Sequence, residues 1–166
     1  MRIIGIDPGT AILGWGVLDS GSGTPTAVGY GAITTPAKQP APERLLVLYR
    51  ELSALLAQHR PAAAAVEELF FSRNVTTALA VGQARGVVLL ALAQAGIPIF
   101  EYKPLVVKQA VVGYGGADKR QMQEMVRLTL NLATAPRPDD VADALAIALC
   151  HAYNAPMLAR VQAAEG

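Results

Sequence analysis

Apolar runs separated by short polar turns predict five β-strands. Three come early, at residues 2–7, 14–19 and 27–34, and turns rich in glycine, serine and proline separate them. Short links of this kind join antiparallel neighbours. Two later runs lie at residues 62–69 and 97–102, and the first is nearly all apolar, which is typical of a strand buried on both faces.

Apolar residues recur at helical spacing in the segments around the two later strands. In residues 43–59, leucines stand at positions 45, 48, 52, 55 and 56. Further helices are predicted at residues 75–94, 105–112, 119–132 and 139–153. Because helices precede both later strands, those strands should join the sheet in parallel. We expect an α/β fold with a five-stranded mixed sheet, three antiparallel strands then two parallel, and helices on both faces. The first strand should be central, with the fourth beside it.

Length and composition predict one soluble domain. The chain has 166 residues, of which 52% are hydrophobic and 16% charged, so a substantial core is expected. We assign residues 1–153 to this domain and residues 154–166 to a flexible tail. The single cysteine, Cys150, excludes an internal disulfide and suits a reducing compartment. Asp7 and Pro8 interrupt the first apolar run too early for a signal peptide. We expect no apolar stretch to be long enough to span a bilayer. The sequence therefore predicts a cytoplasmic protein without membrane contact.

The basic residues are unevenly distributed, although the net charge is only +1. Residues 73–127 contain seven lysines and arginines against three acids, whereas residues 1–72 contain five basic and six acidic side chains. Phosphate binding needs a local positive patch rather than a high overall charge. The count is equally compatible with a solvated helix surface.

Carboxylates in three separate segments are the main candidates for chemistry. Asp7 ends the first strand, Glu67 ends the fourth, and Asp140 and Asp143 stand three apart at the start of the last helix. A desolvated carboxylate needs a partner. Clustered hard oxygen ligands suit Mg²⁺ or Mn²⁺, and two such ions can hydrolyse a phosphodiester. The sequence therefore predicts a nuclease if the fold brings these acids together.

Each acid also has a purely structural interpretation. The sole role of Asp7 could be to hydrogen-bond the turn at Pro8, and the sole role of Asp140 could be to cap its helix. Either Glu67 or its neighbour Glu68 could face solvent, because side chains alternate along a strand. His59 and His151 lack the spacing of metal ligands, and Cys150 is expected to be a small core residue.

An ordered set of motifs resembles the RuvC Holliday-junction resolvases from residue 1 to about residue 151. The matching segments are Ile-Gly-Ile-Asp-Pro-Gly-Thr at 4–10, Val-Glu-Glu-Leu-Phe at 66–70, Gly-Gln-Ala-Arg-Gly at 82–86, Val-Lys-Gln at 107–109, Val-Val-Gly at 111–113 and Asp-Val-Ala-Asp-Ala-Leu-Ala-Ile-Ala at 140–148. The resemblance implies a ribonuclease H-like fold, a homodimer, and two Mg²⁺ ions per active site, with Mn²⁺ as a substitute. It implies symmetric nicking of four-way DNA junctions in recombination and repair, with the branch-migration proteins RuvA and RuvB as partners.

The same resemblance assigns roles to individual residues. Asp7, Glu67, Asp140 and Asp143 would be the catalytic metal ligands, and some relatives carry a histidine at the position of Asp140. Lys119 would act at the scissile phosphate. Phe70 would stack on an unpaired base at the junction centre, although its position alone also fits a core residue. The residues expected to contact DNA are Phe70, Phe71, Arg73, Asn74, Arg85, Lys108, Lys119 and Arg120.

Two other functions share parts of this pattern. A phosphotransferase of the actin and sugar-kinase type also carries Asp-x-Gly-Thr after its first strand, as residues 7–10 do here. That architecture normally needs two such domains, and this chain has one domain's length. A non-catalytic junction-binding protein could keep the fold, but it would tolerate loss of carboxylates that this chain retains.

Overall fold

The computed structural model describes residues 1–21, 23–68 and 75–165, with side chains as far as residue 157. Its described residues form a five-stranded sheet in the order β3-β2-β1-β4-β5. The first three strands are antiparallel, and β4 and β5 join in parallel. The predicted mixed sheet is confirmed, with β1 central and β4 beside it. The strands are β1 Arg2–Asp7, β2 Ile12–Asp19, β3 Thr26–Thr34, β4 Ala63–Glu67 and β5 Ile99–Tyr102.

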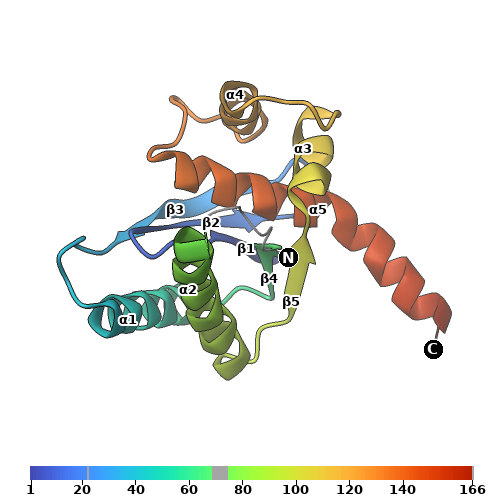
Figure 1. The fold of residues 1–166 in the computed structure, drawn as a ribbon. Helices are drawn as coiled ribbons and strands as arrows, with labels where there is room; N and C mark the ends of the chain where they lie inside the picture. The colour runs from blue at the N-terminus through green and yellow to red at the C-terminus, as the bar shows by residue number, and fades with distance from the viewer. Residues whose placement is uncertain (22, 69–74, 166) are drawn as a thin grey trace.

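Helices cover both faces of the sheet, as predicted (Figure 1). α1 (Ala41–His59) and α2 (Val75–Gln94) pack on one face, around a core that includes Ile4, Leu52 and Val88. α3 (Pro104–Val112), α4 (Lys119–Thr129) and α5 (Asp139–Glu165) lie on the other face. Their core includes Val107, Val126 and Leu145. Two apolar layers therefore hold the sheet between them.

Two glycines let α5 lie directly against the sheet. A Cβ added at Gly5 would lie 2.1 Å from the backbone oxygen of Ala144, and one at Gly14 would lie 1.9 Å from that of Asp140. No other residue type fits at this separation, because real Cβ contacts are never so short. The first turns of α5 are thus held at the carboxyl end of β1.

Two helix ends differ from the sequence prediction. α4 ends at Thr129 rather than residue 132, because Asn131 adopts a positive φ of 51° that terminates the helix. α5 does not end near residue 153 but continues to Glu165, through Pro156, and its last turns extend away from the sheet (Figure 1). Proline removes only one backbone donor, and the alanine-rich flanking sequence favours helix. Flexibility of residues 154–166 stays a prediction.

α2 corrects the expectation that no segment is apolar enough to span a bilayer. By length and composition alone this helix qualifies, with a mean hydropathy of 1.6 over its best window. The inner side of α2 packs in the core through Ala84, Val88 and Leu92. A packed helix of a soluble protein passes the same test, so the high hydropathy reflects one buried side and a second, exposed apolar side.

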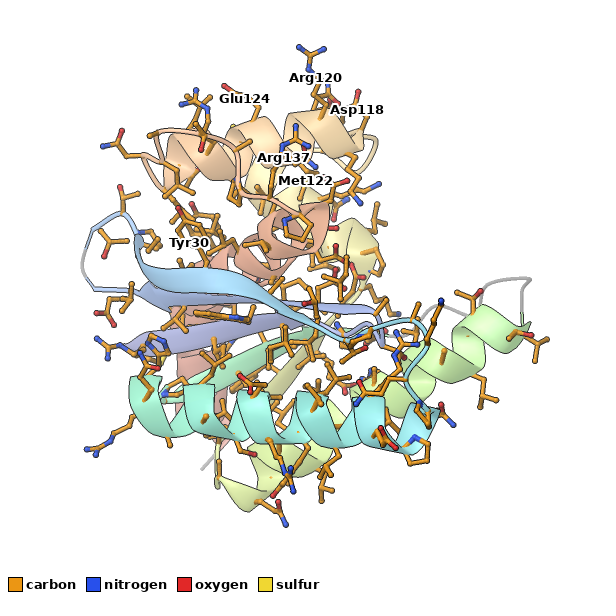
Figure 2. The ribbon with its side chains drawn as sticks, turned by 90° about the vertical axis from the view of Figure 1, so that its left-hand side faces the viewer. Tyr30, Asp118, Arg120, Met122, Glu124 and Arg137 are labelled. Carbon is orange, nitrogen blue, oxygen red and sulfur yellow. The ribbon has the colours of Figure 1, made fainter. Side chains whose placement is uncertain are left out.

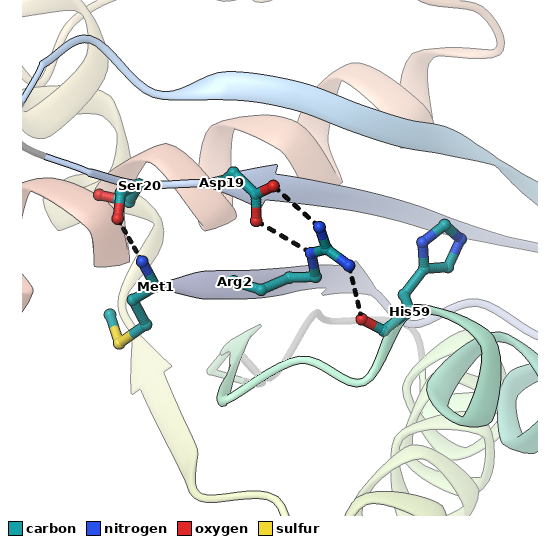
Figure 3. Close-up of polar contacts among 5 residues, drawn as sticks. All are labelled: Met1, Arg2, Asp19, Ser20 and His59. Carbon is teal, nitrogen blue, oxygen red and sulfur yellow. Dashed lines mark hydrogen bonds and ion pairs between the residues drawn. The ribbon is translucent and has the colours of Figure 1, made fainter.

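A cluster of polar contacts anchors the start of β1 (Figure 3). Asp7 is the last residue of the same strand. The Arg2 guanidinium donates two 2.9 Å hydrogen bonds to the Asp19 carboxylate and a third, of 3.2 Å, to the backbone oxygen of His59. These contacts join β1 to β2 and to the end of α1. They hold the strand whose far end carries the first candidate acid.

Candidate active site

Asp7 and Glu67 lie at the carboxyl ends of adjacent parallel strands. The register pairs Ile6 with Val66, so the next residue of each strand reaches the same edge of the sheet. Side chains two apart share a face. Gly5 faces α5, and Ala65 packs in the α3–α5 core, so both acids point toward the face that α5 covers.

The register between β1 and β2 places α5 beside these acids. Asp7 pairs with Gly14, and the backbone of Asp140 rests on that glycine. Asp143 follows one helical turn later. The structure therefore places all four predicted acids within electrostatic range of one another, and the close approach of α5 at Gly14 contributes to this.

Electrostatics show how crowded the four carboxylates are. Burial raises the pKa of Asp7 to about 8, and the nearby charges of Asp143, Glu67 and Asp140 add to the rise, while Lys119 opposes it. Burial also raises the pKa of Glu67, with a further contribution from Asp143, and Lys108 acts in the opposite sense. Ionising these carboxylates together is therefore unfavourable in the absence of a cation.

Lys119, at the start of α4, reaches toward this cluster. Its ammonium lies 3.5 Å from the carboxylate of Asp143 and 3.4 Å from that of Asp139. Burial raises the pKa of Asp143, and Lys119 partly offsets that rise. Burial acts to lower the pKa of Lys119, but Asp143 and Asp139 outweigh it and leave the pKa raised.

Asp139 is a contributor that sequence reasoning missed. It accepts a 2.9 Å hydrogen bond from the Gln123 side chain while also pairing with Lys119. Gln123 and Lys119 of α4 therefore both bind Asp139, the first residue of α5. These contacts hold the Lys119 ammonium near Asp143. The sequence signal for Asp139 was its position next to Asp140. An aspartate at that position is equally typical of a helix start, so it did not indicate a role in the site.

The predicted DNA-contacting residues fall into three groups. Lys108 and Lys119 line one cavity with Glu67 and Asp143, and Arg85 lines another with Asp7, where it also pairs with Glu101 of β5. Arg120 lies on the outer side of α4 with Asp118 and Glu124, and it points away from the body of the protein (Figure 2). Phe70, Phe71, Arg73 and Asn74 lie outside the described residues.

The two histidines and the cysteine make packing contacts within the fold. His151 is buried, and its Nδ1 lies 2.7 Å from the hydroxyl of Tyr102. The ring of His59 packs against Trp15. Cys150 is buried, and burial raises its pKa to about 11, which makes its thiol a poor nucleophile. The structural interpretation of these three residues agrees with their environments.

The donor set suits hard divalent ions in its chemistry. All four ligand candidates offer carboxylate oxygens, which Mg²⁺ and Mn²⁺ prefer. The raised pKa values of Asp7, Glu67 and Asp143 show that their ionised forms are disfavoured in the absence of a cation. As placed, no three His, Cys, Asp or Glu side chains of the described residues converge closely enough to hold an ion. The ligand set would therefore have to close around its ion.

Comparisons with known proteins agree with this geometry. A family model described as crossover junction endodeoxyribonuclease RuvC matches residues 3–151. Proteins of that name from Chloroflexus aurantiacus and Roseiflexus sp. are 70% and 66% identical, over 96% and 97% of this chain and 98% and 96% of theirs. The solved structure of Thermus thermophilus RuvC in complex with a Holliday junction substrate superposes with a TM-score of 0.89 at 44% identity, covering 95% of this chain and 96% of that one. The chain therefore belongs to the RuvC family of crossover junction endodeoxyribonucleases, which are metal-dependent nucleases of ribonuclease H-like fold.

Proposed function

We propose that this chain resolves four-way DNA junctions by hydrolysing one phosphodiester bond in each of two opposing strands, with Asp7, Glu67, Asp140 and Asp143 as the metal ligands. The observation that carries the proposal is that β1, β4 and α5 hold these acids within electrostatic range of one another, where Asp143, Glu67 and Asp140 add to the effect of burial on the pKa of Asp7. A sugar kinase would need a second domain, and family membership favours the nuclease.

Two Mg²⁺ ions are the cofactor we infer, with Mn²⁺ as a substitute. Bound ions would lower the pKa of the attacking water and place positive charge beside the leaving 3′ oxygen. The protein's own contribution is to hold the ligands on rigid elements: Asp7 and Glu67 on paired strands, and Asp140 and Asp143 on the helix packed against Gly14. We expect Lys119, whose ammonium lies 3.5 Å from the Asp143 carboxylate, to neutralise charge on the scissile phosphate.

A synthetic four-way junction with one labelled strand at a time tests this function. With Mg²⁺ we expect nicks at symmetric positions in two opposing strands, giving two ligatable duplexes. EDTA should abolish the nicks, because the carboxylates then have no ion to position. A product pattern with a single nick would contradict the proposal. So would the absence of cleavage under conditions in which an active family member, used as a positive control, cleaves the junction.

A homodimer would supply the two sites that symmetric cleavage needs, and the outer side of α2 is the surface we propose for it. Val75, Leu79, Gly86 and Leu90 follow one stripe of this helix; the three large side chains are 79%, 63% and 54% exposed. A Cβ added at Gly86 would meet nothing within 4 Å, so this glycine does not serve packing within the chain. Small and apolar exposed residues in one stripe suit a helix of a second copy.

Leu79→Glu is therefore expected to weaken the dimer by at least about 100-fold, because a charge would be buried twice in a two-fold interface. Light scattering during size-exclusion chromatography would show a monomer. Leu46→Glu is the matched control, since Leu46 is also exposed (45%) but lies on α1. If both variants keep the mass of the wild type, α2 is not the interface.

The finer family properties stay predictions for this chain. We expect Phe70 to stack on an unpaired base, with Phe71, Arg73 and Asn74 beside it, and Arg120 to contact DNA from the outer side of α4. We also expect RuvA and RuvB as partners and the cytoplasm as location.

A further inference from the structure

Three cavities that share lining residues follow one another across the acid cluster, and we call them together the hollow. The first, of about 240 Å³, is lined by Glu67, Pro104, Lys108, Lys119 and Asp143. The second, of about 180 Å³, contains Asp7 and Arg85 and shares Glu67 and Pro104 with the first. The third, of about 460 Å³, contains Asp140 and shares Val81 with the second. The hollow therefore continues beyond the acids on the side opposite Lys108 and Lys119.

Arg44, in the first turn of α1, lines the far part of this hollow with Gly9, Thr10 and Asp140. Its Nε donates a 2.7 Å hydrogen bond to the hydroxyl of Thr35, which donates in turn to the backbone oxygen of Thr10. The hydroxyl of Thr10 donates to the backbone oxygen of Ala80 in α2. This chain of contacts fixes the guanidinium at the place where α1, α2 and the turn after β1 meet.

Within the described residues, the Arg44 side chain donates one hydrogen bond, through Nε, and its two terminal nitrogens stay available. Among residues 1–21, 23–68 and 75–165, no carboxylate lies within ion-pair distance of Arg44. A purely structural arginine beside an acid cluster would be expected to pair with one of its acids. A guanidinium held by its Nε presents a planar fork of N–H donors that matches a phosphate.

We propose that Arg44 binds a backbone phosphate of the DNA strand that crosses the acids, on the side of the scissile bond opposite Lys108 and Lys119. This inference rests on the proposed function and extends it to a substrate contact. Basic groups at both ends of the hollow neutralise the strand where it enters and where it leaves, while the acids between them hold the reacting phosphate through cations. A phosphate contact positions the strand and carries no sequence information.

The test is binding of a fluorescent four-way junction in EDTA, where no cleavage occurs, at several salt concentrations. Arg44→Gln should weaken binding about three- to tenfold and reduce the slope of log K against log[salt] by about 1, because one phosphate contact is lost. Arg44→Lys should weaken binding less and keep the slope, since its charge stays while the fork is lost. Arg50→Gln, on the same helix but exposed and outside the hollow, is the matched control.

Thr35→Val separates binding from a structural role, because it removes the anchor and keeps the guanidinium. Its salt slope should stay that of the wild type. The inference is overturned if Arg44→Gln has the slope and affinity of Arg50→Gln, or if Arg44→Gln and Thr35→Val lose affinity equally with unchanged slopes. A wild-type protein that fails to bind any junction would instead contradict the proposed function.

Discussion

Glu67→Gln is expected to lower the rate of junction cleavage by at least about 10³-fold, whereas Glu68→Gln should stay within about threefold of the wild type. The two glutamates are neighbours, and both line the same cavity. Glu67 is the last residue of β4 and shares a face with the buried Ala65, which directs it toward Asp143. Glu68 follows the strand, and its backbone nitrogen donates to the backbone oxygen of Tyr102.

The physical reason for the difference is the charge of the ligand set. An amide oxygen in place of the Glu67 carboxylate would be a weaker ligand for a divalent ion, and the chemistry such an ion would supply is activation of the attacking water. Single-turnover cleavage of a labelled junction measures the rate, and junction binding in EDTA should remain within a few fold for both variants. Equal loss at both positions, or greater loss at Glu68, would show that the wrong glutamate has been assigned.

Asp7→Asn is expected to stabilise the metal-free protein at pH 8 while abolishing cleavage. Burial and three neighbouring carboxylates raise the pKa of Asp7 to about 8, so its ionised form is disfavoured in the folded state. Because one pKa unit corresponds to about 1.4 kcal/mol, we expect at least about 2 kcal/mol of added stability, or roughly 4–8 °C in Tm.

The pH dependence of stability has a definite sign. In the unfolded chain Asp7 loses its proton near pH 4, and in the folded protein near pH 8. Between these values the folded state holds more protons, so this contribution to stability is present below pH 4 and is lost as the pH rises through 8. The metal-free wild type should therefore lose Tm over this window relative to Asp7→Asn, and Mg²⁺ should restore it at pH 8 by binding the folded state.

Thermal melts in EDTA and in saturating Mg²⁺, from pH 5 to pH 9, measure both effects. Asp19→Asn is a control of opposite sign, because its hydrogen bond from Arg2 holds the pKa of Asp19 below its usual range, and its loss should lower Tm. If Asp7→Asn melts with the wild type at every pH, and Mg²⁺ shifts neither curve, the four acids do not form an ion-binding cluster.

The elements themselves were readable because their signals are local. Period-two and period-3.6 patterns, with proline and glycine at the turns, predicted strand β1 and helix α2 at their observed bounds. The errors came where local and longer-range effects compete. Asn131 ended α4 early through one left-handed residue, and α5 continued through Pro156 because its alanine-rich flanks outweigh one lost backbone hydrogen bond.

Residue type and spacing along the chain predicted the strands, a central first strand with the fourth beside it, the four candidate acids and the motif order that resembles the family. Only the tertiary structure decided which acids interact. Asp7 pairs with Gly14 of the neighbouring strand, and Gly14 leaves room for the backbone of Asp140. Both contacts join segments that are far apart in the sequence. Packing between helices also decided two further features that no local pattern encodes. One is the hydrogen bond of Gln123 and the ion pair of Lys119 with Asp139, and the other is the position of Arg44 at the end of the hollow.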